Sequence, residues 1–138
     1  THCMRWLGAA QRAHDIAVGY ASERTSFGRA IGDHQGIGYQ LADNYLDLHM
    51  ARLVTRDTAA TLDTGKRGSL ESSRAKVMVS EALFRVADRC IQVLGGRGLS
   101  TDTAVAQIFA ELRAFRIYDG PSEVHRMSIA KKILAGKA

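Results

Sequence analysis

The chain has 138 residues, the size of one domain, and 46% of them are hydrophobic, so it can bury a core of its own. One proline, 13 glycines and abundant Ala, Leu, Arg and Glu favour helices over a β-sandwich. No apolar run reaches 18 residues, so we expect no membrane-spanning helix. We also expect no signal peptide. The net charge of +5 is spread along the chain, so we expect no nucleic-acid partner.

The cysteines and histidines do not form metal or disulfide patterns. Cys3 and Cys90 make no CxxC pair, and we interpret each as a small hydrophobic residue on a helix face in a reducing compartment. No two histidines are three or four residues apart and there is no Glu-x-x-His pair, so no metal site is predicted. The chain opens on THCMRWLG without an initiator methionine, so we expect a segment of a larger protein.

Two long helices are expected first. One runs from about His2 to Glu23, with apolar residues at helical spacing: Trp6, Leu7, Ala10, Ala13, Ala17 and Tyr20. A loop follows, marked by Gly28, Gly32 and Asp33. The second helix, from about Gln35 to Asp63, would be roughly 43 Å long. Its apolar residues form two adjacent rows: Ile37, Leu41, Tyr45 and Leu48, then Leu46, Met50, Leu53 and Val54.

The turn TGKRGS follows the second helix, with Gly65 as its C′ residue. Ser69 is expected to cap a third long helix, which Gly95 and Gly96 end.

Two shorter helices complete the chain. Thr101 is expected to cap a fourth helix, and Pro121 to occupy the first position of a fifth that ends before Gly136. No window alternates as a strand would. Five helices with short connections predict an all-α fold, an antiparallel four-helix bundle of long helices plus a short C-terminal fifth helix.

Two motifs leave alternatives open. In QVLGGRG, the glycines suit a phosphate-binding loop, but no strand precedes them, so spacing alone favours a helix stop and a tight turn. In RIYDGPSEVHR, Asp119 lies just before Gly120 and the start of the last helix. Its carboxylate could cap that helix, where the helix dipole favours a negative charge, or act as a base toward a molecule bound in the bundle.

Four stretches, in order over nearly the whole chain, carry a resemblance to a known family: GAAQRAHDIAVGYASERTSFGRAIGDHQ, LAD, CIQVLGGRGLS and RIYDGPSEVHRMSIAKKIL. Together they resemble the C-terminal helical domain of acyl-CoA dehydrogenases, flavoenzymes that desaturate acyl-CoA thioesters between the α and β carbons. The resemblance implies that residues 1–138 are that domain. It also implies an N-terminal helical domain and a middle β-domain elsewhere in the same subunit.

The resemblance also implies an FAD site. The positions that match FAD contacts of the family are Arg24, Thr25, Ser26, His34, Gln35, Gln92, Val93, Leu94, Gly95, Gly96, Pro121, Ser122 and Glu123. Several of these contacts reach the FAD of a neighbouring subunit, so a homo-oligomer, either dimer or tetramer, is expected. An arginine and glycine amides suit a pyrophosphate, so the resemblance reverses the preference for a simple helix stop at the glycine loop.

The catalytic base of many family members is the glutamate of Y-E-G-T, which aligns with Asp119, and Gly120 would lie at the substrate. The base removes the α proton while hydride leaves the β carbon for flavin N5. Here aspartate replaces glutamate and Pro121 replaces the threonine. Losing one methylene retracts the carboxylate by up to about 1.5 Å, and a misplacement of that order can cost roughly 10²-fold in rate.

Two explanations of this departure remain. A subgroup with DGP followed by EVH carries the same aspartate, whereas other members place the base on the first helix of this domain, at a position before Thr1. We favour Asp119. The resemblance implies an acyl-CoA substrate, electron-transferring flavoprotein as electron acceptor, and a bacterial cytoplasm or mitochondrial matrix. The alternative is an isolated bundle that serves only oligomerisation and FAD contact, without activity of its own.

Overall fold

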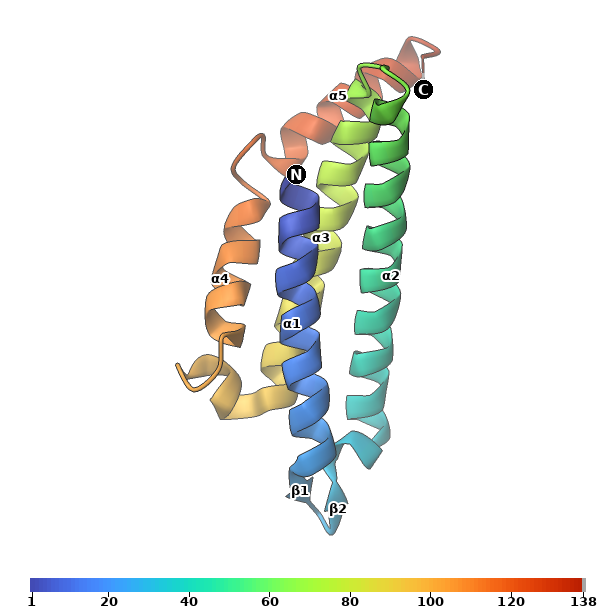
Figure 1. Ribbon diagram of the computed structural model, residues 1–138. Coiled ribbons are helices and arrows are strands. Elements are labelled where there is room, and N and C mark those ends of the chain that lie inside the picture. The colour runs from blue at the N-terminus through green and yellow to red at the C-terminus, as the bar shows by residue number, and fades with distance from the viewer. Residues whose placement is uncertain (138) are drawn as a thin grey trace.

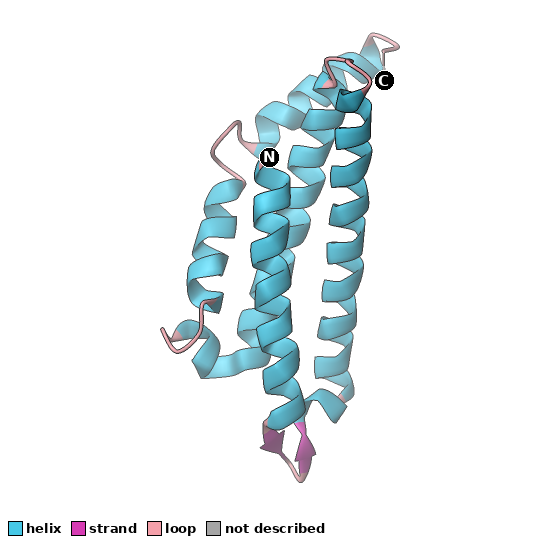
Figure 2. Cartoon of the chain, in the orientation of Figure 1, coloured by secondary structure: helices cyan, strands magenta, loops and turns pink. Residues whose placement is uncertain are grey.

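The computed structural model describes residues 1–137, which form five α-helices, two 3₁₀ helices and one short hairpin (Figure 1, Figure 2). Their bounds are α1 His2–Glu23, β1 Thr25–Ser26, β2 Arg29–Ala30, η1 Ile31–Asp33, α2 Gln35–Asp63, α3 Ser69–Leu94, η2 Gly95–Leu99, α4 Val105–Phe115 and α5 Ser122–Leu134. Helices α1 to α4 alternate in direction, and α5 lies at the end of the bundle where α1 begins (Figure 1). The predicted antiparallel all-α bundle with a fifth helix is confirmed, although α4 is short.

Helix α3 is the centre of the bundle and packs against α1, α2, α4 and α5. Its buried face includes Val79, Leu83 and Val86, each fully buried. Alanines dominate the facing side of α1, where Ala10 and Ala17 are fully buried. Because an alanine projects only one carbon from the backbone, these helices can approach closely, and the larger side chains of α3 fill the remaining space.

The expected apolar face of α2 is partly wrong. The buried residues of α2 are Asn44, Leu48, Ala51 and Thr58. Tyr45, Leu46 and Leu53, which belong to the two apolar rows of α2, are 63%, 63% and 52% exposed. Helix α2 lies at one side of the bundle (Figure 1) and packs against α1 and α3, so only a narrow stripe of it is covered within this chain.

Three expected helix starts are displaced by a few residues. Ser69 is the first residue of α3, and the preceding Gly68 takes the cap position at a left-handed φ of 57°. A Cβ at Gly68 would lie 2.6 Å from Leu62 Cδ2, so close packing against the end of α2 favours glycine there. Thr101 lies outside α4, which begins at Val105.

Pro121 precedes α5 rather than opening it, and its extended ψ of 152° places it at the cap position before Ser122. The hairpin Thr25–Ser26 and Arg29–Ala30 was not predicted, because strands of two residues are too short to show an alternating pattern. Gly65 and Gly95 do end helices, with φ of 79° and 59°.

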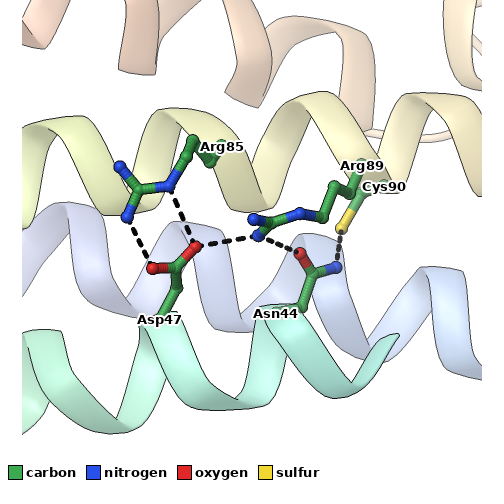
Figure 3. Close-up of polar contacts among 5 residues, drawn as sticks. All are labelled: Asn44, Asp47, Arg85, Arg89 and Cys90. Atoms are coloured by element: carbon green, nitrogen blue, oxygen red, sulfur yellow. Dashed lines mark hydrogen bonds and ion pairs between the residues drawn. The ribbon is translucent and has the colours of Figure 1, made fainter. Parts of the chain in front are cut away.

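A polar network joins α2 to α3 near mid-bundle (Figure 3). Arg85 Nη2 donates to Asp47 Oδ1 at 2.6 Å, and Arg89 Nη1 donates to Asp47 Oδ2 at 2.8 Å. Arg89 also reaches the buried Asn44, whose amide faces the Cys90 sulfur. Burial opposes the charge on Asp47, but the hydrogen bonds from the two arginines outweigh it and lower the pKa of this carboxyl.

Candidate functional site

The expected site residues lie at two opposite ends of the bundle. One group, called here the aspartate end, comprises residues 119–123, and Asp119 contacts His2 at the start of α1. The other, called the hairpin end, comprises residues 24–35 and 92–96, and Arg24 directly follows the end of α1. Since α1 has 22 residues, the two ends are separated by roughly 33 Å. One chain therefore cannot place both groups of residues around the same small ligand.

At the aspartate end, the loop between α4 and α5 is fixed through its backbone. Asp119 and Gly120 both have left-handed φ values, 53° and 93°. The buried Lys76 of α3 donates from Nζ to the carbonyl oxygens of Phe115 at 2.7 Å and Gly120 at 3.1 Å. His125 Nε2 lies 3.2 Å from the carbonyl oxygen of Asp119, which can only accept, so this nitrogen donates.

Gly120 is packed closely enough that a side chain would not fit. A Cβ at this position would lie 2.7 Å from His125 Nε2. The other nitrogen of His125, Nδ1, faces the hydroxyl of Ser73 on α3 at 3.2 Å. Because Nε2 donates, Nδ1 of a neutral ring accepts from Ser73. The loop is therefore tied to α3 at two separate points, Lys76 and Ser73.

The carboxylate of Asp119 points toward α1 rather than into α5. Its Oδ2 lies 2.5 Å from His2 Nδ1, and the two side chains are 53% and 48% exposed. No side chain caps the first turn of α5, so the alternative role of Asp119 as a helix cap is not supported. Asp119 and His2 also line a cavity of about 300 Å³, together with Cys3, Lys76 and His125. A space of this size is at the lower end for small-molecule sites.

The titratable groups beside this cavity are shifted mainly by burial. Burial lowers the pKa of Lys76, and the negative charges of the Asp119 and Glu81 carboxylates oppose this shift. Burial raises the pKa of the Cys3 thiol, and burial away from this cavity, beside Asn44, raises that of Cys90 to about 12. Both thiols therefore stay protonated near neutral pH and are not nucleophiles.

Residues 121–123 differ in what they can offer to a ligand. Ser122 is buried and its hydroxyl donates to Glu81 Oε1 at 2.8 Å, so this side chain anchors α5 to α3. Glu81 also pairs with Arg116 at 2.8 Å. Burial opposes its charge, but these partners outweigh burial and lower the pKa of Glu81. Pro121 and Glu123 are exposed.

At the hairpin end, the structure brings Ser26 and His34 together. His34 Nε2 lies 3.1 Å from the carbonyl oxygen of Ser26, while Nδ1 lies 3.2 Å from Arg29 Nη2. Because a guanidinium only donates, Nδ1 accepts and Nε2 carries the hydrogen. Arg24 and Thr25 are exposed, as is Gln35, whose amide contacts Tyr39. These side chains face solvent in this chain.

The other part of the hairpin end is the glycine segment Gly95–Gly98, which directly follows α3. Gly95 and Gly96 are exposed, and a Cβ at either would meet nothing within 4 Å. Gly98 is different, since a Cβ there would lie 2.7 Å from the carbonyl oxygen of Ile91. Of the remaining expected residues, Gln92 is exposed, whereas Val93 and Leu94 are buried, so only their backbones can face a ligand.

Several residues of these two ends were missed by the sequence analysis. Lys76 and His125 fix the Asp119 loop through backbone carbonyl oxygens, which no sequence pattern marks. Arg29 and Arg97 add exposed cationic groups at the hairpin end, where the Arg97 guanidinium lies 5.7 Å from the Tyr20 ring centre. With Arg24 and the open glycine backbone, this donor set fits a pyrophosphate group.

Two further findings concern residues 1–137. No helix within this range is both long and apolar enough to cross a membrane. No group of three or more His, Cys, Asp or Glu side chains in the same range is placed to hold a metal ion.

Comparison with known proteins gives the family. The family profile described as acyl-CoA dehydrogenase, C-terminal domain, matches residues 1–134. The chain is 39% identical over 132 residues to acyl-CoA dehydrogenase family member 11 of Gallus gallus, covering 94% of this chain and 17% of that protein. It is 35% identical over 128 residues to the caffeyl-CoA reductase-Etf complex subunit CarC of Acetobacterium woodii, covering 93% and 34%.

A solved structure agrees with this assignment. The fold matches butyryl-CoA dehydrogenase from Megasphaera elsdenii with a TM-score of 0.92 at 30% identity, over 96% of this chain and 34% of that one. The chain therefore belongs to the acyl-CoA dehydrogenase family. It spans about a third or less of the length of these relatives.

Proposed function

We propose that the full-length protein containing this chain is an FAD-dependent acyl-CoA dehydrogenase in which Asp119 is the catalytic base. The observation that carries this proposal is the placement of Asp119. Its half-exposed carboxylate lines a cavity of about 300 Å³, on a loop held through its backbone by Lys76 and His125. A base that acts on a weakly acidic C–H bond depends on such placement more than on its strength.

In this proposal, a carboxylate oxygen of Asp119 takes the α proton of the acyl thioester. Bound FAD supplies the acceptor for the hydride that leaves the β carbon. Lys76 keeps the carbonyl oxygens of Phe115 and Gly120 fixed, so the backbone that carries Asp119 stays in place as the proton is transferred. The N-terminal helical and middle β-domains of the full-length protein would close the cavity and exclude water.

We infer that each chain contributes to two flavin sites in a homo-oligomer. The aspartate end would face one FAD, and the hairpin end, with Arg24, His34 and the Gly95–Gly96 backbone, would contact the FAD of a neighbouring subunit. The separation of roughly 33 Å along α1 supports this division, because one flavin cannot meet both ends. Three exposed apolar residues of α2 at seven-residue spacing offer a surface for subunit contact: Tyr39, Leu46 and Leu53.

The proposed acyl-CoA substrate and electron acceptor follow from the family. The relative from Acetobacterium woodii is named as a subunit of a reductase-Etf complex. We propose that this protein likewise passes its electrons to an electron-transferring flavoprotein.

The test is anaerobic bleaching of the flavin in the full-length protein by a panel of acyl-CoA thioesters. Asp119→Asn keeps the size of the side chain but removes the base, so we expect bleaching to slow by about 10²- to 10⁴-fold while FAD stays bound. Asp102→Asn, at an exposed aspartate outside both ends, is the control and should bleach normally. Normal bleaching of Asp119→Asn would place the base elsewhere, such as the position before Thr1.

A further inference from the structure

We propose that His2 is a positioning residue for Asp119, holding the shortened carboxylate in place through the contact between its Nδ1 and a carboxylate oxygen. This inference rests on the proposed role of Asp119 as the base. It concerns the side chain alone, because the backbone of the same loop is held by other groups.

The backbone contacts leave the carboxylate itself free to rotate. Lys76 fixes the carbonyl oxygens of Phe115 and Gly120, and His125 fixes that of Asp119. These three bonds set the position of the Asp119 Cα and Cβ. None of them involves a carboxylate oxygen, so none of them sets χ1 or χ2 of this half-exposed side chain.

His2 supplies the missing constraint from a different helix. Its Nδ1 lies 2.5 Å from Asp119 Oδ2. An ionised carboxylate only accepts, so Nδ1 carries the hydrogen in either the neutral or the protonated ring. The ring of Tyr118 lies edge-on to His2, with centroids 5.9 Å apart and planes at 79°, which restricts rotation of the imidazole. Tyr118 thus orients the His2 ring, and His2 in turn orients the carboxylate of Asp119.

The location of the pair makes this more than a surface contact. An exposed ion pair of ordinary type contributes little to stability. Both side chains, however, line the same cavity of about 300 Å³. A carboxylate one methylene shorter than glutamate has a smaller range of positions from which it can reach a substrate carbon, so a fixed orientation matters more for it.

The experiment compares three variants of the full-length protein by the rate of anaerobic flavin bleaching with saturating acyl-CoA. Asparagine can place its side-chain N–H group near the position of Nδ1, whereas glutamine places its own nearer that of Nε2. We expect His2→Asn to stay within about threefold of the wild-type rate. We expect His2→Gln and His2→Leu to fall by up to about 10²-fold, with FAD content and KM unchanged.

Two results would overturn the inference. If all three variants bleach at the wild-type rate, the contact with Asp119 has no role in the reaction. If all three are equally slow, the shape of the imidazole matters and its Nδ1 donor does not. Asp119→Asn, measured in parallel, separates the two proposals: a fast Asp119→Asn enzyme refutes the base, whereas a slow one beside fast His2 variants refutes only the positioning role.

Discussion

The two ends of the bundle are built in different ways. At the aspartate end, polar groups are paired within the chain: Lys76 with two carbonyl oxygens, His125 with Ser73, and Glu81 with Ser122 and Arg116. At the hairpin end, Arg24 and Gln35 are exposed and the glycine backbone at residues 95–96 is open. Phe27, at the hairpin tip, is 94% exposed in a left-handed conformation with φ of 54°.

The difference indicates what each end does. Groups that are paired internally keep their geometry without a ligand, as a base must. Exposed cations and an exposed aromatic ring are available to another molecule that covers this end. We therefore expect substitutions at the aspartate end to change reaction rate, and substitutions at the hairpin end to change cofactor retention or assembly.

Among substitutions other than those of Asp119 itself, the largest effect is expected for Lys76→Met. Methionine fits the volume but leaves the carbonyl oxygens of Phe115 and Gly120 without their donor, so the Asp119 loop should lose its fixed position. We expect kcat to fall by about 10²-fold while FAD remains bound. Steady-state kinetics and the flavin absorbance per subunit measure the two effects.

Lys66→Met is the matched control, since Lys66 is exposed in the turn after α2. Equal losses of kcat in the two variants would mean that the Lys76 contacts do not govern the loop. Loss of FAD in Lys76→Met with unchanged kcat per bound flavin would reverse the proposed division between the two ends.

Gly98→Ala is expected to have the next largest effect. The added Cβ would lie 2.7 Å from Ile91 O and 2.9 Å from Ile91 Cα, both of them backbone atoms that cannot turn aside. Such overpacking costs about 1–3 kcal/mol, which should lower the apparent melting temperature by several degrees.

Gly96→Ala is the matched comparison, because its Cβ would meet nothing within 4 Å. Its melting temperature should stay unchanged. If Gly96→Ala nevertheless retains less FAD, the cofactor approaches this backbone closely, as the proposal requires. A fall in stability equal to that of Gly98→Ala would contradict the packing shown here.

Arg24→Ala is expected to weaken FAD retention by about tenfold, because one charge-assisted hydrogen bond to a phosphate would be lost. Arg24 is exposed and lies beyond the last residue of α1, so stability should not change. Arg12→Ala, at an exposed arginine within α1, is the control. Equal FAD dissociation constants for the two variants, measured by fluorescence titration of the apoprotein, would remove Arg24 from the cofactor site.

The sequence predicts the fold well, because helical periodicity is a local property. The expected bounds of α1 and α2, His2–Glu23 and Gln35–Asp63, agree with the structure. The caps at Ser69 and Thr101 were wrong because helix starts depend on what packs around them, as the contact of Gly68 with Leu62 shows. The outward face of α2 was missed because apolar residues alone do not say which surface they cover.

The candidate site was only partly accessible from the sequence. The motif RIYDGPSEVHR pointed to Asp119 as a candidate base. The residues that hold this loop come from three helices: His2 from α1, Lys76 from α3 and His125 from α5. Lys76 binds backbone carbonyl oxygens, which leave no trace in the amino-acid sequence. The role of each expected site residue stays a prediction, and substitutions of Asp119, Arg24 and Gly96 test three of them.

The smallest effect is expected away from both ends, in the network of Asp47, Arg85 and Arg89 (Figure 3). Asp47→Asn keeps the shape but removes the charge that both arginines share. We expect a loss of about 1–2 kcal/mol, a lower apparent melting temperature and unchanged bleaching. The exposed Asp43, one turn earlier on α2, provides the control Asp43→Asn.

The pH dependence of this loss identifies its cause. The arginines lower the pKa of Asp47 in the folded protein, so its contribution is fully present above the unfolded value of about 4. It disappears as the pH falls through the lower folded value, when the wild-type carboxyl also loses its charge. The melting temperatures of wild type and Asp47→Asn should therefore differ most at neutral pH and converge in acid. A difference that persists in acid would assign the loss to packing, and slower bleaching would connect mid-bundle geometry to the aspartate end.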